Sequence, residues 1–349
     1  MYKRQTYDSV ILHITSDADI DVHRTNGDPI PQLILTCPDY VCRNYHELVE
    51  TESYPPCYRI IPTLSIFTIH SWMSALQLER FEQKASQLSE RLKRCNSNWE
   101  DAFFITLARN FGFGLNGDAF ETWANRIPLR AVDKHRDELF QIEAFFFGQA
   151  GLLQGTAGDE YYLRLKKEYE YLSHKFGLTP MDVSQWRFLR LRPTNFPHIR
   201  IAQLAVLYHR SYGLLSRIME AETVTKVHEI LKGGTSAYWV NHYTFEHPSP
   251  SRPKTLSNSS LDLLIINTVA TFLYSYGVHK GKEEYCARAG AFLEELKAEY
   301  NYITRMWEQC GIKAANASDS QALIQLKKEY CDKKKCLYCR IGYEYLKRN

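Results

Sequence analysis

Three cysteines near the end of the sequence have the spacing of metal ligands. Cys331, Cys336 and Cys339 fall within nine residues, separated by four residues and then by two. Two thiolates separated by two residues can bind one ion from a tight turn, and a third nearby nearly completes a tetrahedral shell. The lysines at 333–335 lie between them and would lower the thiol pKa values, which favours thiolate. The run therefore predicts a metal site.

The sequence leaves the fourth ligand and the metal open. Cys310, which lies just before a turn at Gly311, is our best candidate, and any of the twelve histidines could serve instead. A structural zinc site needs four protein ligands. An iron–sulfur cluster could be held by three cysteines and an outside ligand. In the alternative interpretation the cysteines are free thiols, because reduced cysteine is a common small apolar residue of intracellular proteins.

A second candidate site is the basic segment 186–200, which contains four arginines and no acidic residue. Aromatic residues are interspersed with the arginines, and a helix start follows. Arginine binds phosphate in a bidentate manner, aromatic rings stack on bases, and helix N-termini favour anions. We therefore predict contacts to nucleic-acid phosphates from Arg187, Arg190, Arg192, Arg200, Lys333, Lys334 and Lys335. The alternative is that these arginines extend from an apolar element and pair with acids elsewhere.

Glu143 and Gln149 lie within the apolar segment 133–153, which has helical spacing. A buried glutamate can be a general base or a ligand. More often it pairs with an arginine that locks two helices together. We expect this pairing, with segment 187–200 as one source of the arginine. The sequence contains no Gly-x-Ser-x-Gly elbow, phosphate loop or Gly-x-Gly-x-x-Gly motif.

The elements that must position these residues are mainly helical. Residues 7–36 have the pattern of β structure, with an apolar strand at 10–14 and a hairpin about Asn26-Gly27-Asp28. Residues 37–62 contain four prolines and are predicted to be irregular. Beyond residue 63, apolar residues recur with helical spacing. The expected helices are 71–94, 99–111, 118–127, 133–153, 159–176, 197–221, 224–232, 260–277, 283–310 and 318–330.

We therefore predict a mainly α protein, in which a small N-terminal β remnant (strand plus hairpin) precedes a large multi-helix domain with a Cys-rich C-terminal tail. Residues 6–62 form the β remnant and an irregular linker, residues 63–326 the helical domain, and residues 327–349 the basic tail. Residues 1–5 resemble translated sequencing adaptor of the kind found in assembled metagenomes. Because an apolar strand follows them directly, we expect a truncated N-terminal domain.

Composition limits the class of protein. Of the 349 residues, 44% are hydrophobic, which is enough for a sizeable core, and the net charge of +3 is too small to indicate a nucleic-acid partner by itself. The start lacks the apolar stretch of a signal peptide, and no segment approaches 18 uninterrupted apolar residues. The cysteines do not form an evenly spaced secreted framework. We expect a cytoplasmic protein with no membrane partner, and the oligomeric state stays open.

Several sequence blocks distributed over residues 6–349 carry a family resemblance. They are Asn98-Trp99-Glu100, Leu107–Phe113, Leu139–Ala144, Phe147–Leu153, Arg190–Pro193, Asn195–Pro197, Ser320–Lys327 and the cysteine run. These blocks resemble a bacterial family catalogued as domain of unknown function 2851. No activity is established for this family, so the resemblance identifies a family and not a function.

The resemblance implies that family members begin further upstream than this chain. Their upstream segment is similar to the metal-binding core of restriction-endonuclease-like nucleases, whose carboxylates hold Mg²⁺ and activate water. None of those residues is in this sequence, so we expect no catalytic residue and no Mg²⁺ site here. The leading hypothesis is a nucleic-acid-associated helical part of a nuclease-like protein, inactive alone. The alternative is a helical protein-interaction scaffold with a structural metal clip.

Overall fold

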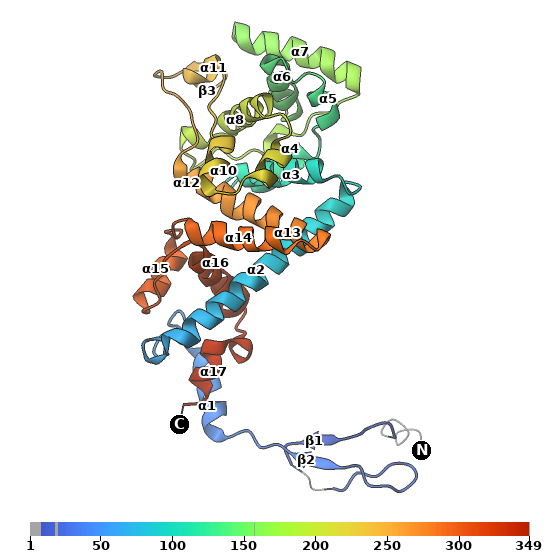
Figure 1. Ribbon diagram of the computed structural model, residues 1–349, viewed down its shortest axis with the longest axis vertical. Coiled ribbons are helices and arrows are strands. Elements are labelled where there is room, and N and C mark those ends of the chain that lie inside the picture. Colours follow the sequence, from blue (N-terminus) through green and yellow to red (C-terminus); the bar gives the residue numbers. More distant parts are fainter. Residues whose placement is uncertain (1–7, 18–19, 157, 349) are drawn as a thin grey trace. The chain divides into compact units, whose positions relative to one another are not determined.

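The structure is a computed structural model that describes residues 8–17, 20–156 and 158–348 (Figure 1). It confirms the mainly helical architecture with small strands near the N-terminus. Residues 1–5, interpreted as adaptor sequence, lie outside the described residues. Two compact units make up the chain. The first contains the described residues up to Leu76, residues 300–314 and the described residues from Ala322 onward, and the second contains residues 77–299 and 315–321.

The strands of the first unit form a small parallel pair. β1 (His13–Thr15) lies beside β2 (Gln32–Ile34), with His13 opposite Gln32. The predicted hairpin turn is present as well, since Gly27 has φ 90° and an antiparallel bridge joins His23 to Pro29. The strand expected at 10–14 is shifted to 13–15. Ile14 and Ile34 are exposed, so this pair does not have the buried faces of a central strand.

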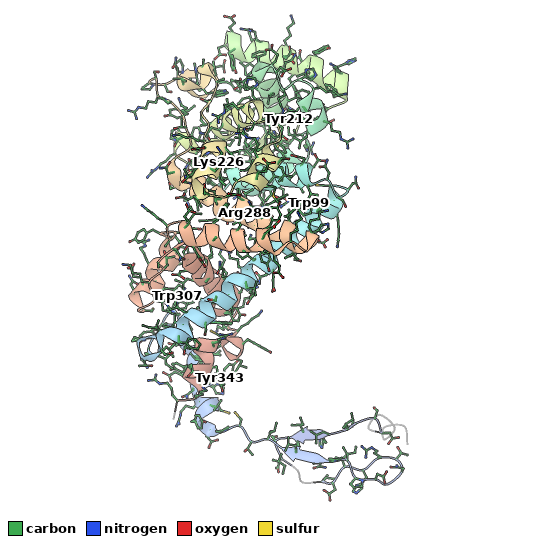
Figure 2. All side chains as sticks on the ribbon, in the orientation of Figure 1. Trp99, Tyr212, Lys226, Arg288, Trp307 and Tyr343 are labelled. Atoms are coloured by element: carbon green, nitrogen blue, oxygen red, sulfur yellow. The ribbon has the colours of Figure 1, made fainter. Side chains whose placement is uncertain are left out.

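The helices of the first unit come from both ends of the chain. They are α1 (Asp39–Glu50), the start of α2 (Ile66–Arg94), α15 (Tyr302–Gln309), the end of α16 (Ala317–Gln325), a π-helical segment (Leu326–Cys331) and α17 (Arg340–Leu346). α1 and α17 contact each other, so the basic tail and the N-terminal segment share one unit. Their core includes Leu76, Trp307 and Ile341, which are all buried. Figure 2 labels Trp307.

One prediction for this unit was wrong, because the segment expected to be irregular contains a three-turn helix. α1 begins directly after Pro38, whose backbone is extended. Proline is tolerated at the start of a helix because no backbone N–H is needed there. Leu48 is its buried contact. The other prolines of the segment lie at 55, 56 and 62, outside α1, so they do not interrupt the helix.

The second unit contains the rest of the helices. They are the end of α2, α3 (Trp99–Phe111), α4 (Gly117–Ala124), α5 (Leu129–Asp133), α6 (Leu139–Gln149), α7 (Glu160–Phe176), α8 (Pro197–Arg210), α9 (Leu214–Glu220), α10 (Val224–Leu231), α11 (Ala237–Val240), α12 (Asn258–Leu264), α13 (Ala270–Lys280), α14 (Glu283–Glu295) and the start of α16. Strands β3 (His242–Thr244) and β4 (His247–Pro248) pair antiparallel. Helix α6 packs against α7 and α8. Its residues from Ile142 to Gln149 are all buried, as its apolar sequence predicts.

Side-chain and glycine signals set several helix ends in this unit. The Asn98 side chain accepts hydrogen bonds from the backbone N–H groups of Glu100 and Asp101, which caps α3. The helix predicted at 197–221 is divided into α8 and α9 at Gly213, whose φ of 59° is left-handed. The helix predicted at 283–310 is likewise divided into α14 and α15.

One helix of the second unit is long and apolar enough to cross a membrane by length and composition alone. It spans Asn258–Lys280 and joins α12 to α13 through a π-helical segment, Ile265–Val269. Of its most apolar stretch, 67% is buried inside the protein. A core helix of a soluble protein has the same character, and this helix packs against α14 and α3.

Candidate functional sites

Four cysteines line one small apolar cavity in the first unit. Its volume is about 20 Å³, and its walls are Pro56, Cys57, Tyr330, Cys331, Cys336, Cys339 and Gly342. Three of these cysteines are the predicted ligands. Cys57 is the fourth, and sequence reasoning missed it because it lies far away in the chain, without a neighbouring cysteine at ligand spacing. Cys310 packs against the same core but does not line this cavity.

A tight turn brings Cys336 and Cys339 together. The N–H of Cys339 donates to the carbonyl of Cys336 at 3.2 Å, and α17 starts directly afterwards. Gly342 allows the turn to close, because a Cβ at this position would lie 2.2 Å from the Cys336 oxygen. Cys331 ends the π-helical segment on the other side of the same loop. The segment Cys-x4-Cys-x2-Cys thus places its three cysteines around the same cavity.

Burial controls the charge of these cysteines. It is the main cause that raises the pKa of Cys57 far above its usual value, and that of Cys331 to about 12. Repulsion from neighbouring thiolates raises both pKa values further, with Cys336 and Cys339 acting on each. Without a cation, all four side chains are therefore neutral thiols at physiological pH.

Hydrogen-bond donors surround the most buried member of the cluster. Burial raises the pKa of Cys339, whereas the N–H groups of Gly342, Ile341 and the Trp72 indole act in the opposite direction. Trp72 is 8% exposed, and its Nε1 has no partner at full hydrogen-bonding distance. Its ring packs edge-on against Tyr330, with centroids 5.3 Å apart. A thiolate at Cys339 would give this donor an acceptor.

These thiols are not preassembled as ligands. Among the described residues, no three or more His, Cys, Asp or Glu side chains stand in an arrangement that could hold a metal ion. The four cysteines are instead placed around a common cavity, with their backbones fixed by the turn, the π-helical segment and the residues around Pro56.

The arginine segment forms an anchored loop in the second unit. Trp186 is buried, and its Nε1 donates to the carbonyl of Ala150 at 2.8 Å. The Asn116 side chain bonds both the N–H and the carbonyl of Arg187, each at 2.9 Å. Two short 3-10 turns flank the loop, and Arg190 between them has a left-handed φ of 64°. The backbone of the loop is therefore held in place.

Three of the four predicted arginines are exposed on this loop: Arg187, Arg190 and Arg192. Within the described part of the chain, their side chains form no ion pair. Leu189 between them is 82% exposed. We call residues 187–192 the arginine loop.

Arg200 has a different place, inside the protein. Its guanidinium donates to Gln203 at 2.9 Å and to Asn195 at 2.6 Å, and it lies over the Phe113 ring at 4.4 Å. Burial lowers its pKa to about 10. Although we expected Arg200 to contact phosphate, its side chain is used within the fold and is not available to a ligand at the surface.

The tail lysines are exposed but partly engaged. Lys333 pairs with Glu329, and the Nζ of Lys334 donates to the carbonyl of Val49 at 3.1 Å. Lys335 is exposed. These lysines belong to the first unit and the arginine loop to the second.

Our expectation for Glu143 was wrong. The side chain is 1% exposed, but its partners are hydroxyl groups: Tyr161 donates to one oxygen, and Ser236 donates to the other at 2.8 Å. Burial raises its pKa to about 7, against the effect of these two donors. A carboxyl that keeps its proton does not need an arginine to be buried. Burial in the apolar helix α6 thus favours the protonated carboxyl over the ionised one.

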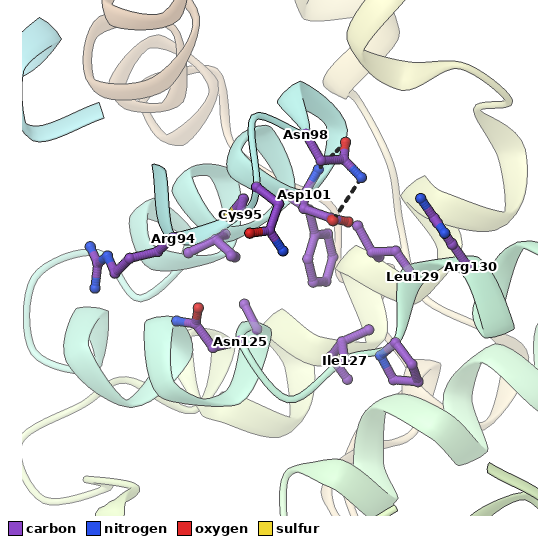
Figure 3. A pocket seen from close by; sticks show the side chains of 13 residues that line it. Arg94, Cys95, Asn98, Asp101, Asn125, Ile127, Leu129 and Arg130 are labelled. Atoms are coloured by element: carbon purple, nitrogen blue, oxygen red, sulfur yellow. Dashed lines mark hydrogen bonds between the residues drawn. The ribbon is translucent and has the colours of Figure 1, made fainter. Parts of the chain in front are cut away.

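A groove of about 520 Å³ in the second unit was not expected from the sequence (Figure 3). Arg94, Asn125 and Arg130 line it, together with Asp101, whose carboxylate accepts a hydrogen bond from the Asn98 side chain at 2.7 Å. Asn96 and Ser97, which follow α2, both have left-handed φ values, 51° and 62°. The N–H of Ser97 donates to the carbonyl of Leu92 at 2.9 Å, so this left-handed conformation closes the C-terminal end of α2. Cys95 also lines the groove, and no hydrogen bond between its thiol and a base is recorded among the described residues.

Comparison with known protein families places the chain in one of them. A family model described as "Protein of unknown function (DUF2851)" matches residues 2–302. It includes Cys57 and the arginine loop, whereas Cys331, Cys336 and Cys339 lie beyond the matched segment. No curated protein and no solved structure matches the chain.

Proposed function

We propose, from the premise that this chain belongs to the DUF2851 family, that it binds nucleic acid through the arginine loop. The observation that carries the proposal is the placement of Arg187, Arg190 and Arg192. All three are exposed on one short loop, and none forms an ion pair among the described residues. The positive charges of the three arginines repel one another, and an anionic partner would neutralise them.

Phosphate groups suit these side chains best. Guanidinium binds phosphate oxygens with two parallel hydrogen bonds, and several such contacts along one strand add up because each releases counterions. The anchored backbone reduces the entropy that ordering the loop would otherwise cost. Leu189 offers an apolar contact that an unstacked base can use, which favours single-stranded nucleic acid over a duplex.

The groove lies in the same unit and is compatible with this function. Arg94 and Arg130 on its walls are exposed cations, and the amide groups of Asn98 and Asn125 can donate or accept hydrogen bonds. We assign it no base specificity. The contact that defines the proposal is between the arginine loop and the phosphates.

The proposal is tested by fluorescence anisotropy with labelled single-stranded and double-stranded oligonucleotides at low salt. Replacing Arg190 and Arg192 together by alanine is expected to weaken binding about tenfold or more, because each lost charged hydrogen bond contributes about 1.5–3 kcal/mol. Lys226→Ala is the matched control, since Lys226 is an exposed cation of the same unit already paired with Glu229 (Figure 2). It is expected to bind like the wild type.

Two results would contradict the proposal. One is the absence of binding by the wild type at low salt, which favours the helical scaffold. The other is equal affinity of the double variant and the wild type, which would place binding elsewhere on the protein.

A further inference from the structure

We propose that Cys57, Cys331, Cys336 and Cys339 together bind one tetrahedral zinc ion, which fastens the C-terminal tail to the segment around Cys57. This metal site is independent of nucleic-acid binding. It identifies a fourth ligand from the N-terminal part of the chain in place of Cys310. The chemical class is a closed structural site with four thiolates and no open position.

The shape and lining of the cavity favour a single soft ion. A volume of about 20 Å³ accommodates one small ion. Four cysteines line it together with Pro56, Tyr330 and Gly342, and no carboxylate or imidazole is among the lining residues. Soft thiolate ligands select zinc over magnesium or calcium. The Cys336–Cys339 turn supplies two ligands from one loop, as in other structural zinc sites.

The arrangement of the side chains is that of neutral thiols. Four neutral thiols gain nothing by converging, and four thiolates placed around one point would repel one another by Coulomb's law. A cation removes that repulsion and draws the sulfurs inward. Binding therefore requires the sulfurs to move inward from the positions that they have among the described residues.

The buried indole N–H of Trp72, which has no hydrogen-bond partner by geometry, is a second observation at this site. Leaving a buried N–H without an acceptor costs about 1–3 kcal/mol, and a neutral thiol is a weak acceptor. A zinc-bound thiolate at Cys339 would accept from Trp72 and from the N–H groups of Ile341 and Gly342. Such outer hydrogen bonds orient metal ligands and stabilise them.

Basic side chains around the site balance its charge. Four thiolates with one Zn²⁺ carry a net charge of about −2. Arg340 lies over the Trp72 ring at 5.2 Å and donates to Ser71 at 3.1 Å. The three lysines at 333–335 are in the loop that carries the ligands. A positively charged surrounding therefore stabilises the anionic centre.

The test is the metal content of the full-length chain, purified under reducing conditions and measured by inductively coupled plasma mass spectrometry. We expect one zinc per chain, retained by Cys310→Ser and lost from Cys57→Ser. Loss of zinc from Cys310→Ser, or its retention by Cys57→Ser, would overturn the assignment of the fourth ligand. Iron with visible absorption, or no stoichiometric metal, would overturn the site itself.

A second measurement keeps the test valid if Cys57→Ser does not fold. The wild-type protein is alkylated before and after chelation of metal, and the modified cysteines are identified by mass spectrometry. Cys57 and the three tail cysteines should react only after chelation. The exposed Cys37 and Cys42 should react in both samples and serve as internal controls. Equal reaction of the four cavity cysteines in both samples would contradict the proposal.

Discussion

The indole N–H of Trp72 lies close enough to the sulfur of Cys339 to lower the pKa of that thiol, yet it has no acceptor at full hydrogen-bonding distance. The two residues come from opposite ends of the chain and belong to the same core. This pair shows that the neutral cysteine cluster leaves a donor unsatisfied. It also gives a way to perturb the metal site without removing a ligand.

Trp72→Phe should keep the aromatic packing and remove only the N–H. Because outer hydrogen bonds contribute to metal affinity, zinc should be bound about 10–100-fold more weakly. Competition with a chromophoric chelator measures this change. Trp307→Phe is the control, since Trp307 is also buried with an unpartnered Nε1 but is not among the groups that act on Cys339. Equal affinities of the two variants would argue against the Trp72 contact.

Gly342→Ala should open the turn that carries two of the cysteines. The added Cβ would meet the Cys336 oxygen at 2.2 Å, and backbone atoms cannot give way by rotation. We expect zinc to be lost and the tail to become sensitive to protease. Gly290→Ala is the control, because a Cβ there meets nothing within 4 Å. If the Gly342→Ala protein keeps its zinc, zinc binding does not depend on this conformation of the turn.

Glu143 should make the protein less stable as the pH rises. The unfolded carboxyl releases its proton near its ordinary pKa of 4.5, whereas the folded one keeps it until about pH 7. The folded state thus binds more protons in this window, and its free energy of unfolding falls across it, by on the order of 3 kcal/mol in total.

Glu143→Gln imitates the protonated side chain and should remove this pH dependence. Denaturant unfolding between pH 4.5 and pH 7.5 measures it. Glu170→Gln, at an exposed position, should leave the wild-type slope intact. A Glu143→Gln protein with an unchanged slope would mean that the carboxyl is ionised in the fold.

The arginines of segment 186–200 should separate into two classes. Arg200→Ala removes a buried guanidinium and leaves Asn195 and Gln203 without their partner, so it should cost about 3 kcal/mol of unfolding free energy. Arg192→Ala changes an exposed side chain and should alter stability by less than about 0.5 kcal/mol. Thermal unfolding of both variants is the measurement. Equal destabilisation would contradict the different placements.

The sequence was sufficient for the local features. Apolar spacing predicted a helix within segment 133–153, where the buried helix α6 lies, and the helix expected at 99–111 is present as α3. The hairpin turn at Gly27 was also predictable, because Asn-Gly-Asp strongly favours a turn. In each case the signal lies within a few residues of the structure that it determines.

Features that depend on tertiary contacts could not be read in the same way. Cys57 joins the cavity only because the two ends of the chain share one unit. Arg200 and Arg192 look alike in the sequence, and their different burial depends on how α8 packs. The hydroxyl partners of Glu143 come from α7 and from the residues before α11, positions without a recognisable pattern.

The contact between the arginine loop and phosphate is the central functional claim, and the salt dependence of binding tests it most directly. Anisotropy titrations with single-stranded oligonucleotide over a series of salt concentrations give the slope of log K against log[salt]. Each phosphate contact contributes about −0.7 for single strands. The Arg190→Ala/Arg192→Ala variant should therefore have a slope about 1.4 less steep than the wild type. Identical slopes for the two proteins would contradict the account.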